Sequence, residues 1–239
     1  MSSRDAPASG GGSRKRIEWA RAEIWRYALE CQKIDDLAEH LLEIAGQAVE
    51  ADSVALLPFD EHYETLSVTQ QWRRDGKTVG VGVSVPAWLV DIIRGKPYMA
   101  LSVEDLPKLA RPVLNPIVKR FGTRSLAVLP FGDPHHPDGF VSVSVYHGEK
   151  RFSEEELDFL RELTRVVHLR TSQLIAEHQL RDREKSYRNI VENMQDVVYR
   201  ADLDGRLTYI STAHKDVFGY DSVDEMLGRR VAEFYVHPE

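Results

Sequence analysis

The sequence predicts an α+β protein: an antiparallel sheet flanked by helices, then a long connecting helix, then a smaller α/β segment. Three observations support this fold class. Helical patterns alternate with short β-like runs in the first half of the chain. Neither Gly nor Pro occurs from Glu149 to Asp204, and two further β-like runs follow around an Asp-Gly turn.

Composition limits the classes of function. The chain has 239 residues, of which 42% are hydrophobic, which is enough for a buried core. Its 31 basic and 38 acidic residues give a net charge of -7, and no basic stripe stands out, so we expect no direct nucleic-acid binding. One cysteine allows no disulfide framework, which favours a cytoplasmic location. No run approaches the roughly 18 apolar residues of a membrane span.

Two helices are expected at the amino-terminal end. Residues 1–16 are polar and rich in Gly and Ser, and we expect a disordered tail there. From Ile17 to Glu30 apolar residues recur every three or four positions, the spacing of a helix with one buried face. A second helix runs from about Asp35, which we expect to cap it, to Val49.

The next hundred residues read as short strands and helices. Two turn-bounded runs suggest a hairpin, and three later runs, the last with alternating Val and Ser, predict further strands. Glycines and prolines mark two short helices between them. The expected strands are Ser53–Asp60, Thr65–Trp72, Tyr98–Ser102, Ser125–Phe131 and Phe140–Tyr146, and the expected helices are Pro86–Arg94 and Pro112–Phe121.

A long helix follows these strands. Ser153 and Glu156 have the spacing of a capping box, so the helix starts there and runs to about Met194, roughly 60 Å at 1.5 Å per residue. Its later part is highly charged, as in a connecting helix. Seven-residue spacings predict a parallel homodimer with a seam along this helix and the first one. The predicted seam residues are Ile17, Ile24, Leu160, Val167 and Leu174.

The last segment reads as a hairpin from Asp196 to Ser211, followed by short helical pieces at Ala213–Phe218 and Ser222–Leu227. An isolated two-stranded hairpin is marginally stable in water, because its apolar face lacks a covering layer. We therefore expect residues 195–239 to be the least stable part of the chain.

The region 17–170 resembles a GAF domain in its order of elements. The most specific part of the likeness is the passage in which Gly139–Ser144 leads into Arg151–Leu160, with its Phe-Ser-acidic entry to the final helix. Residues 171–194 would then be a connecting signalling helix.

From Glu184 onward the chain resembles the first half of a PAS domain, assigned here to residues 195–239. The matching residues are Tyr187, Ile190, Met194, Asp202–Gly205, Tyr209–Ser211, Phe218–Tyr220, Glu225–Gly228 and His237–Glu239. A complete PAS domain continues through three further strands, so the resemblance implies a partial domain.

The two resemblances imply a sensory input module of a prokaryotic signal-transduction protein, with a two-component sensor histidine kinase as the main expectation. The output domain would lie outside this chain, because no phospho-acceptor helix, nucleotide lid or DNA-reading helix pair is recognisable. No catalytic module is therefore predicted. A stand-alone enzyme with a GAF-like core and a purely structural dimeriser without a ligand are the alternatives.

The GAF resemblance also implies a cup that can enclose a small molecule. The small serines would leave room for such a ligand, although the same residues would equally close an ordinary apolar core. The identity of the ligand stays open, and no cofactor is named. The residues expected to line the cup are Trp72, Trp88, Ile92, Met99, Ile117, Phe121, Ser142 and Ser144.

Two other features are expected to be structural. Four potential metal ligands fall between Asp133 and Asp138, but a surface hairpin loop uses the same residue types, so no metal site is predicted. Phytochrome-type GAF domains carry their reactive cysteine after the middle of the domain, whereas Cys31 lies in the opening helix. Any ligand is therefore expected to bind without covalent attachment.

Overall fold

The computed structural model describes residues 12–60, 62, 66–77, 82–83, 92–105, 108, 111, 119, 122–133, 135–194 and 196–234. The chain divides into two compact units, Met1–Leu174 and Ile175–Glu239. Most of the two expected short helices, Pro86–Arg94 and Pro112–Phe121, falls outside the described residues. In the part of the chain that is described, no helix is long and apolar enough to cross a membrane.

The first unit is built on a five-stranded antiparallel sheet with the strand order β3-β1-β7-β6-β5. Four of the five expected strands are confirmed, and β7 begins earlier than predicted because Pro137 pairs with Gly132. The bounds are β1 (Ser53–Pro58), β3 (Gln70–Arg73), β5 (Met99–Ser102), β6 (Ser125–Gly132) and β7 (Pro137–Val145), with β2 (Leu66–Ser67) and β4 (Gly82–Val83) in a separate pair and a 3₁₀ turn at Val103–Asp105. The expected strand Thr65–Trp72 is instead two short strands, β2 and β3, which belong to different sheets.

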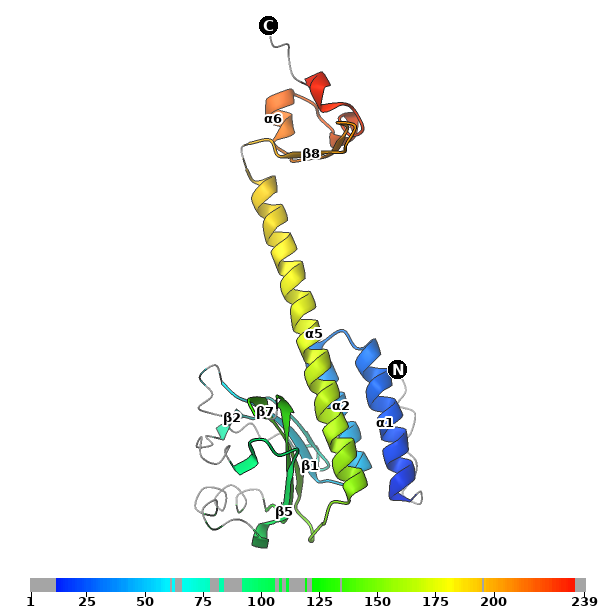
Figure 1. The fold of residues 1–239 in the computed structure, drawn as a ribbon, viewed down its shortest axis with the longest axis vertical. Helices are drawn as coiled ribbons and strands as arrows, with labels where there is room; N and C mark the ends of the chain where they lie inside the picture. The colour runs from blue at the N-terminus through cyan, green and yellow to red at the C-terminus, as the bar shows by residue number, and fades with distance from the viewer. Residues whose placement is uncertain are drawn as a thin grey trace. The chain divides into compact units, whose positions relative to one another are not determined.

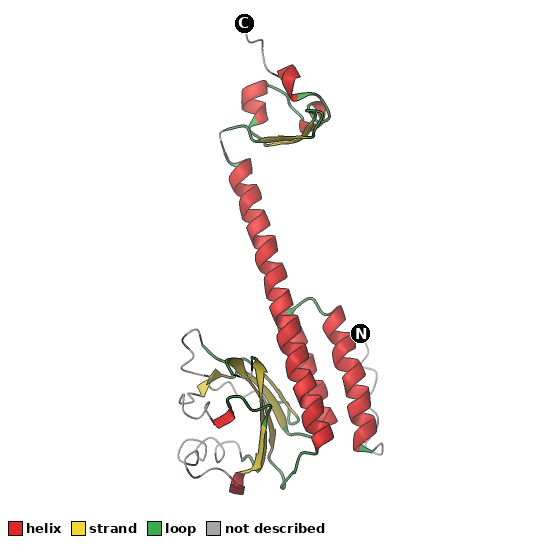
Figure 2. Ribbon diagram, viewed as in Figure 1, coloured by secondary structure: helices red, strands yellow, loops and turns green. Residues whose placement is uncertain are grey.

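Helices cover one face of this sheet. Figures 1 and 2 show α1 (Ser13–Glu30), α2 (Ile34–Ala48) and the first part of α5 (Glu154–Glu192) side by side along it. Val54, Ala127, Val141 and Val143 point from the strands into the core that these helices close. The alternation of Val and Ser in β7 is explained by this arrangement, since Val141 and Val143 point into the core that the helices close, whereas Ser142 and Ser144 project from the opposite face.

The starts of the first two helices differ from the prediction. Helix α1 begins at Ser13 rather than near Ile17. Helix α2 begins at Ile34, and its N-cap is Lys33, which makes no side-chain cap bond. Asp35 does not cap the helix because it lies inside the first turn, where its Oδ1 accepts a hydrogen bond from Gln70 Nε2 at 3.0 Å.

The capping box at the start of α5 is confirmed. The backbone N–H of Glu156 donates to Ser153 Oγ at 3.2 Å, and the backbone N–H of Ser153 donates to Glu156 Oε2 at 2.9 Å. Lys150 Nζ also pairs with Glu156 Oε1 at 2.8 Å. These contacts satisfy backbone donors that a helix start leaves free, so the helix begins where the sequence predicted.

The seam predicted for the dimer is wrong at every residue named for it. Ile17, Ile24, Leu160, Val167 and Leu174 are at most 6% exposed and belong to the core of a single chain. These residues do recur every seven positions, but the apolar face that they form is already covered by the other helices and the sheet of the same protomer. Arg170 reinforces this packing, because its guanidinium donates to the carbonyls of Ala28 at 2.7 Å and Cys31 at 2.9 Å.

The second unit contains the predicted hairpin, formed by β8 (Tyr199–Ala201) and β9 (Leu207–Ile210). Helix α6 (His214–Phe218) follows, and Gly219 ends it in the left-handed conformation at φ 72°. Two 3₁₀ turns, Val223–Glu225 and Val231–Phe234, complete the described part. Leu207, Ile210 and Met226 are buried here and form a small core of their own.

Candidate functional site

The face of the sheet that looks away from the helices carries a row of mostly small side chains. Pairing of the strands places Met99, Val128, Ser142 and Ala55 next to one another across β5, β6, β7 and β1. Residues that pair across a sheet project from the same face. The smallest side chains of the row, those of Ala55 and Ser142, therefore lie side by side on β1 and β7.

An apolar cluster adjoins this row. Leu66, Ile93 and Phe140 are buried, and partly buried residues surround them. The rings of Phe59 and Phe140 meet edge to face with centroids 5.7 Å apart. The cluster provides a hydrophobic wall of the kind that small-molecule sites use. The partly buried residues are Leu57, Phe59, Ile92, Met99 and Val128.

The next row along the strands is polar on β3, β1 and β7 and continues as Leu126 and Leu101 on β6 and β5. Ser53 and Ser144 pair across β1 and β7, and Gln71 Nε2 donates to Ser53 Oγ at 3.0 Å. Within the described residues, neither Ser142 nor Ser144 makes a side-chain hydrogen bond. Both residues are half-buried, so their hydroxyl groups are available beside the apolar cluster.

The structure places four of the eight expected lining residues on this face: Ile92, Met99, Ser142 and Ser144. Trp72 lies on the opposite face, because it pairs with Val54 and packs against Gly46 of α2. The other expected lining residues, Trp88, Ile117 and Phe121, lie outside the described residues.

The sequence analysis missed Ser53, Ala55 and Gln71, which also lie on this face. The alternation rule applied to β1 would have identified the first two, since they share the parity of Leu57 rather than that of buried Val54.

A cation stands at the polar end of the face. Arg73 pairs with Ser53 in the sheet, and its guanidinium donates to Asp75 at 2.9 and 2.8 Å. The hydrogen bonds from Arg73 hold the pKa of Asp75 well below its usual range, and the same pairing raises the pKa of Arg73. The charge of Arg73 is thus neutralised by Asp75, so we do not expect this side chain to bind an anionic ligand.

The loop between β6 and β7 uses its polar residues for local structure. Asp133 Oδ1 accepts the backbone N–H of His135 at 2.7 Å, and this hydrogen bond lowers the pKa of Asp133. Asp138 Oδ2 lies 3.2 Å from His168 Nδ1. In the described ranges, no group of three His, Cys, Asp or Glu residues is placed to hold a metal ion.

Cys31 lies on the helix side of the first unit. The residue is buried after α1, and its Sγ donates to the Lys33 carbonyl oxygen at 3.2 Å. Because it belongs to the core between the helices, it does not reach the serine-bearing face of the sheet.

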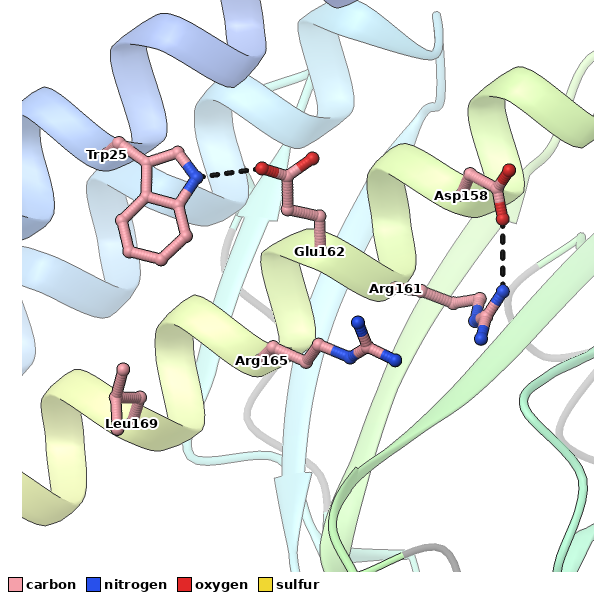
Figure 3. A pocket seen from close by; sticks show the side chains of 6 residues that line it. All are labelled: Trp25, Asp158, Arg161, Glu162, Arg165 and Leu169. Atoms are coloured by element: carbon pink, nitrogen blue, oxygen red, sulfur yellow. Dashed lines mark hydrogen bonds and ion pairs between the residues drawn. The ribbon is translucent and has the colours of Figure 1, made fainter.

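A groove of about 430 Å³ lies on the helix side of the first unit, along α1 and α5. Figure 3 shows Trp25 reaching across it toward Glu162, and Trp25 Nε1 donates to Glu162 Oε1 at 2.7 Å. Arg21 Nε lies 3.1 Å from the other carboxylate oxygen of Glu162. The charge of Glu162 is therefore already paired across the two helices.

The first unit is thus an α+β domain, in which a five-stranded antiparallel sheet packs one of its faces against α1, α2 and α5. A family model for the GAF domain matches residues 33–170, so the chain belongs to the GAF family. A PAS-fold model matches residues 185–239. The order of a GAF domain followed by a PAS-like segment is thus as the sequence predicted.

Solved structures agree with this fold. A phycoerythrobilin-bound GAF domain from a cyanobacterial phytochrome is 14% identical, with a TM-score of 0.56, covering 69% of this chain and 99% of that one. The bacteriophytochrome RpBphP3 from R. palustris is 13% identical, with a TM-score of 0.57, covering 80% of this chain and 45% of that one. No curated protein matches by sequence. The solved structures show the fold, and the GAF and PAS family matches support a signalling input module.

Proposed function

We propose that this chain is the input part of a cytoplasmic two-component sensor histidine kinase, and that it acts as a parallel homodimer. Its signal is a small molecule held without covalent attachment on the serine-bearing face of the sheet. The proposal rests on the GAF and PAS matches and above all on one further observation, an exposed apolar stripe on the helix that follows the GAF domain.

The stripe follows the later turns of α5. Leu180 and Tyr187 lie seven residues apart on α5 and are 69% and 70% exposed, and Met194, seven residues further along the chain and 41% exposed, lies just beyond the end of the helix. Ile190, 58% exposed, falls between two of them at the complementary spacing of three and four. Large apolar side chains at heptad spacing on an otherwise charged helix are typical of a coiled-coil seam. A second copy of this helix would cover them.

Charges beside the stripe suit a parallel pairing. Arg183 occupies the seam position between Leu180 and Tyr187, and Glu184 follows it at a flanking position. In a parallel pair in register, each Arg183 would face Glu184 of the partner subunit, and the pairing would offset the cost of a cation at the seam. An antiparallel pair would not bring these two residues together in the same way.

The helix also offers a route for the signal. Helix α5 is continuous from Glu154 to Glu192, and its first turns pack against the sheet that carries the proposed ligand face. A continuous helix that can pack in two arrangements can transmit a small displacement from one end to the other. A ligand on the serine-bearing face would then act by favouring one arrangement of the paired helices.

Ligand binding is supported by the chemistry of the face rather than by any attachment site. The apolar cluster around Phe140 offers hydrophobic contact, and Ser142 and Ser144 offer hydroxyl groups beside it. The only cysteine, Cys31, is buried among the helices. A covalent thioether of the kind that needs a cysteine next to the ligand is therefore not part of this proposal.

Cysteine cross-linking tests the dimer directly. In a Cys31→Ser background, Leu180→Cys should form a disulfide-linked dimer on mild oxidation, because the same seam position of two parallel helices lies face to face. Arg181→Cys, one residue away and also exposed, is the matched control and should cross-link far less. Equal yields from the two variants, or a monomer in sedimentation at tens of micromolar, would rule out the proposed seam.

A further inference from the structure

A second cleft lies beside α5, between this helix and the end of β6. Its volume is about 330 Å³. One wall is formed by Arg161, Arg165 and His168, which succeed one another at four- and three-residue spacing and so share a face of the helix. Pro130 and Phe131 form the opposite wall. The residues that line the cleft include two arginines and a histidine but no carboxylate.

The acidic residues nearest to these arginines already have partners. Asp158 accepts a hydrogen bond from Arg161 Nη1 at 3.0 Å, and Glu162 is held by Trp25 and Arg21. Arg165 is exposed, and no ion pair or hydrogen bond of its guanidinium occurs within the described part of the chain. Within the described residues, Arg165 is therefore the arginine of the cleft whose charge no acidic residue pairs, since Arg161 pairs with Asp158 and His168 Nδ1 lies 3.2 Å from Asp138 Oδ2.

The two guanidinium groups extend from the same side of α5. Figure 3 shows the side chains of Arg161 and Arg165 pointing away from Trp25, and both arginines line the groove along α1 and α5 as well as the cleft. Like charges four residues apart on a helix repel each other, which destabilises the helix slightly. An anion between the two arginines would offset this repulsion and accept hydrogen bonds from the N–H groups of both guanidinium ions.

We propose that this cleft is a second ligand site, which binds a small organic anion through a carboxylate or phosphate group that bridges Arg161 and Arg165. The apolar body of the ligand lies against Pro97, Pro130 and Phe131, and Leu169 closes the outer end. The volume is at the lower end of the range for small-molecule sites, which fits a ligand about the size of a substituted benzene ring.

This site is separate from the proposed ligand face. Phe131 belongs to the core on the helix side of the sheet, whereas Ser142 projects from the opposite face. The inference therefore goes beyond the proposed function, and either one can fail without the other.

Direct titration of the purified chain with phenyl phosphate and with benzoate tests the site, with benzyl alcohol as the neutral probe at the same ionic strength. Isothermal calorimetry should detect binding of at least one anion and none of the alcohol. Arg165→Gln and Arg161→Gln should each weaken that affinity roughly tenfold or more, because each removes a charge-assisted hydrogen bond. Arg181→Gln, an exposed arginine elsewhere on α5, should leave it unchanged.

The probes also separate the two ligand classes. Binding of phenyl phosphate alone assigns a phosphate, and binding of benzoate alone assigns a carboxylate. Binding of neither anion overturns the proposal, and so does equal affinity in the Arg165→Gln and Arg181→Gln proteins. Unchanged thermal unfolding of the variants without ligand would show that any loss of affinity arises at the cleft, because Arg165 is exposed and its substitution removes no core contact.

Discussion

Gly46 shows how a single residue fixes the packing of the first unit. It lies in α2 and is buried, and the space that a β-carbon would need there is occupied by the ring of Trp72. The contact brings α2 directly onto β3. A glycine inside a helix normally costs about 1 kcal/mol relative to alanine, so its presence here reflects this close approach rather than helix propensity.

Gly46→Ala should therefore destabilise the protein in spite of the better helix propensity of alanine. Overpacking of a filled core costs typically 1–3 kcal/mol, and the propensity gain offsets about 1 kcal/mol of it. Urea unfolding of Gly46→Ala, Trp72→Leu and the double variant measures this. The double variant should be more stable than the sum of the single effects predicts, since Trp72→Leu makes room for the new methyl group. Additive effects would show that the two residues do not meet.

At the scale of elements, a single carboxylate joins the end of α5 to the hairpin of the second unit. Glu192 accepts hydrogen bonds from the Tyr209 hydroxyl at 2.9 Å and from the Thr212 backbone N–H at 3.0 Å. The hydrogen bond from Tyr209 is the main cause of a lowered pKa of Glu192. The pKa of Tyr209 is raised, mainly by burial and then by the same hydrogen bond.

The lowered pKa predicts how the stability of this connection depends on pH. Because the folded-state pKa lies below the ordinary value of 4.5, the contribution of Glu192 is fully present above pH 4.5 and is lost as the pH falls through the folded-state value. NMR titration of the Glu192 carboxyl should give a midpoint below 4.5, and Tyr209→Phe should move it upward. A midpoint at 4.5 in both proteins would contradict the hydrogen bond.

The elements were predicted to different degrees, for physical reasons. Local signals located α5 and the last hairpin well, since the Ser153 to Glu156 capping box and the Asp202 to Gly205 turn depend on neighbours in sequence. The predictions that were wrong concern features that depend on tertiary contacts. Trp72 was placed with the ligand-lining residues because its residue type suits a cup, but its face depends on which strand pairs with β1.

The predicted seam failed for a related reason. Seven-residue spacing identifies a buried stripe on a helix but not what covers it, and α1, α2 and the sheet cover Leu160 and Val167 within one protomer. The apolar residues left uncovered, such as Leu180 and Tyr187, stand out only once the exposure of each side chain is known.

At the scale of the whole molecule, the two units differ in how much core they contain. Among the described residues, the main core of the first unit contains 26 buried residues from its helices and sheet, whereas the cluster of the second unit contains three. The second unit has a two-stranded sheet in place of the five-stranded sheet of the first. Stability follows buried apolar area, so the two units should open with very different free energies.

We predict that the second unit is the less stable of the two. Its hairpin buries Leu207 and Ile210 against Met226, but Tyr199 on β8 is 46% exposed, and a two-stranded hairpin with so small a cover is marginal in water. Amide hydrogen exchange should show protection of β8 and β9 far below that of β6 and β7. The measurement needs a sample whose oligomeric state is known, because pairing of α5 would raise the protection of neighbouring residues. Equal protection of the two hairpins in a monomeric sample would show that the small core of Leu207, Ile210 and Met226 is sufficient to fold the second unit.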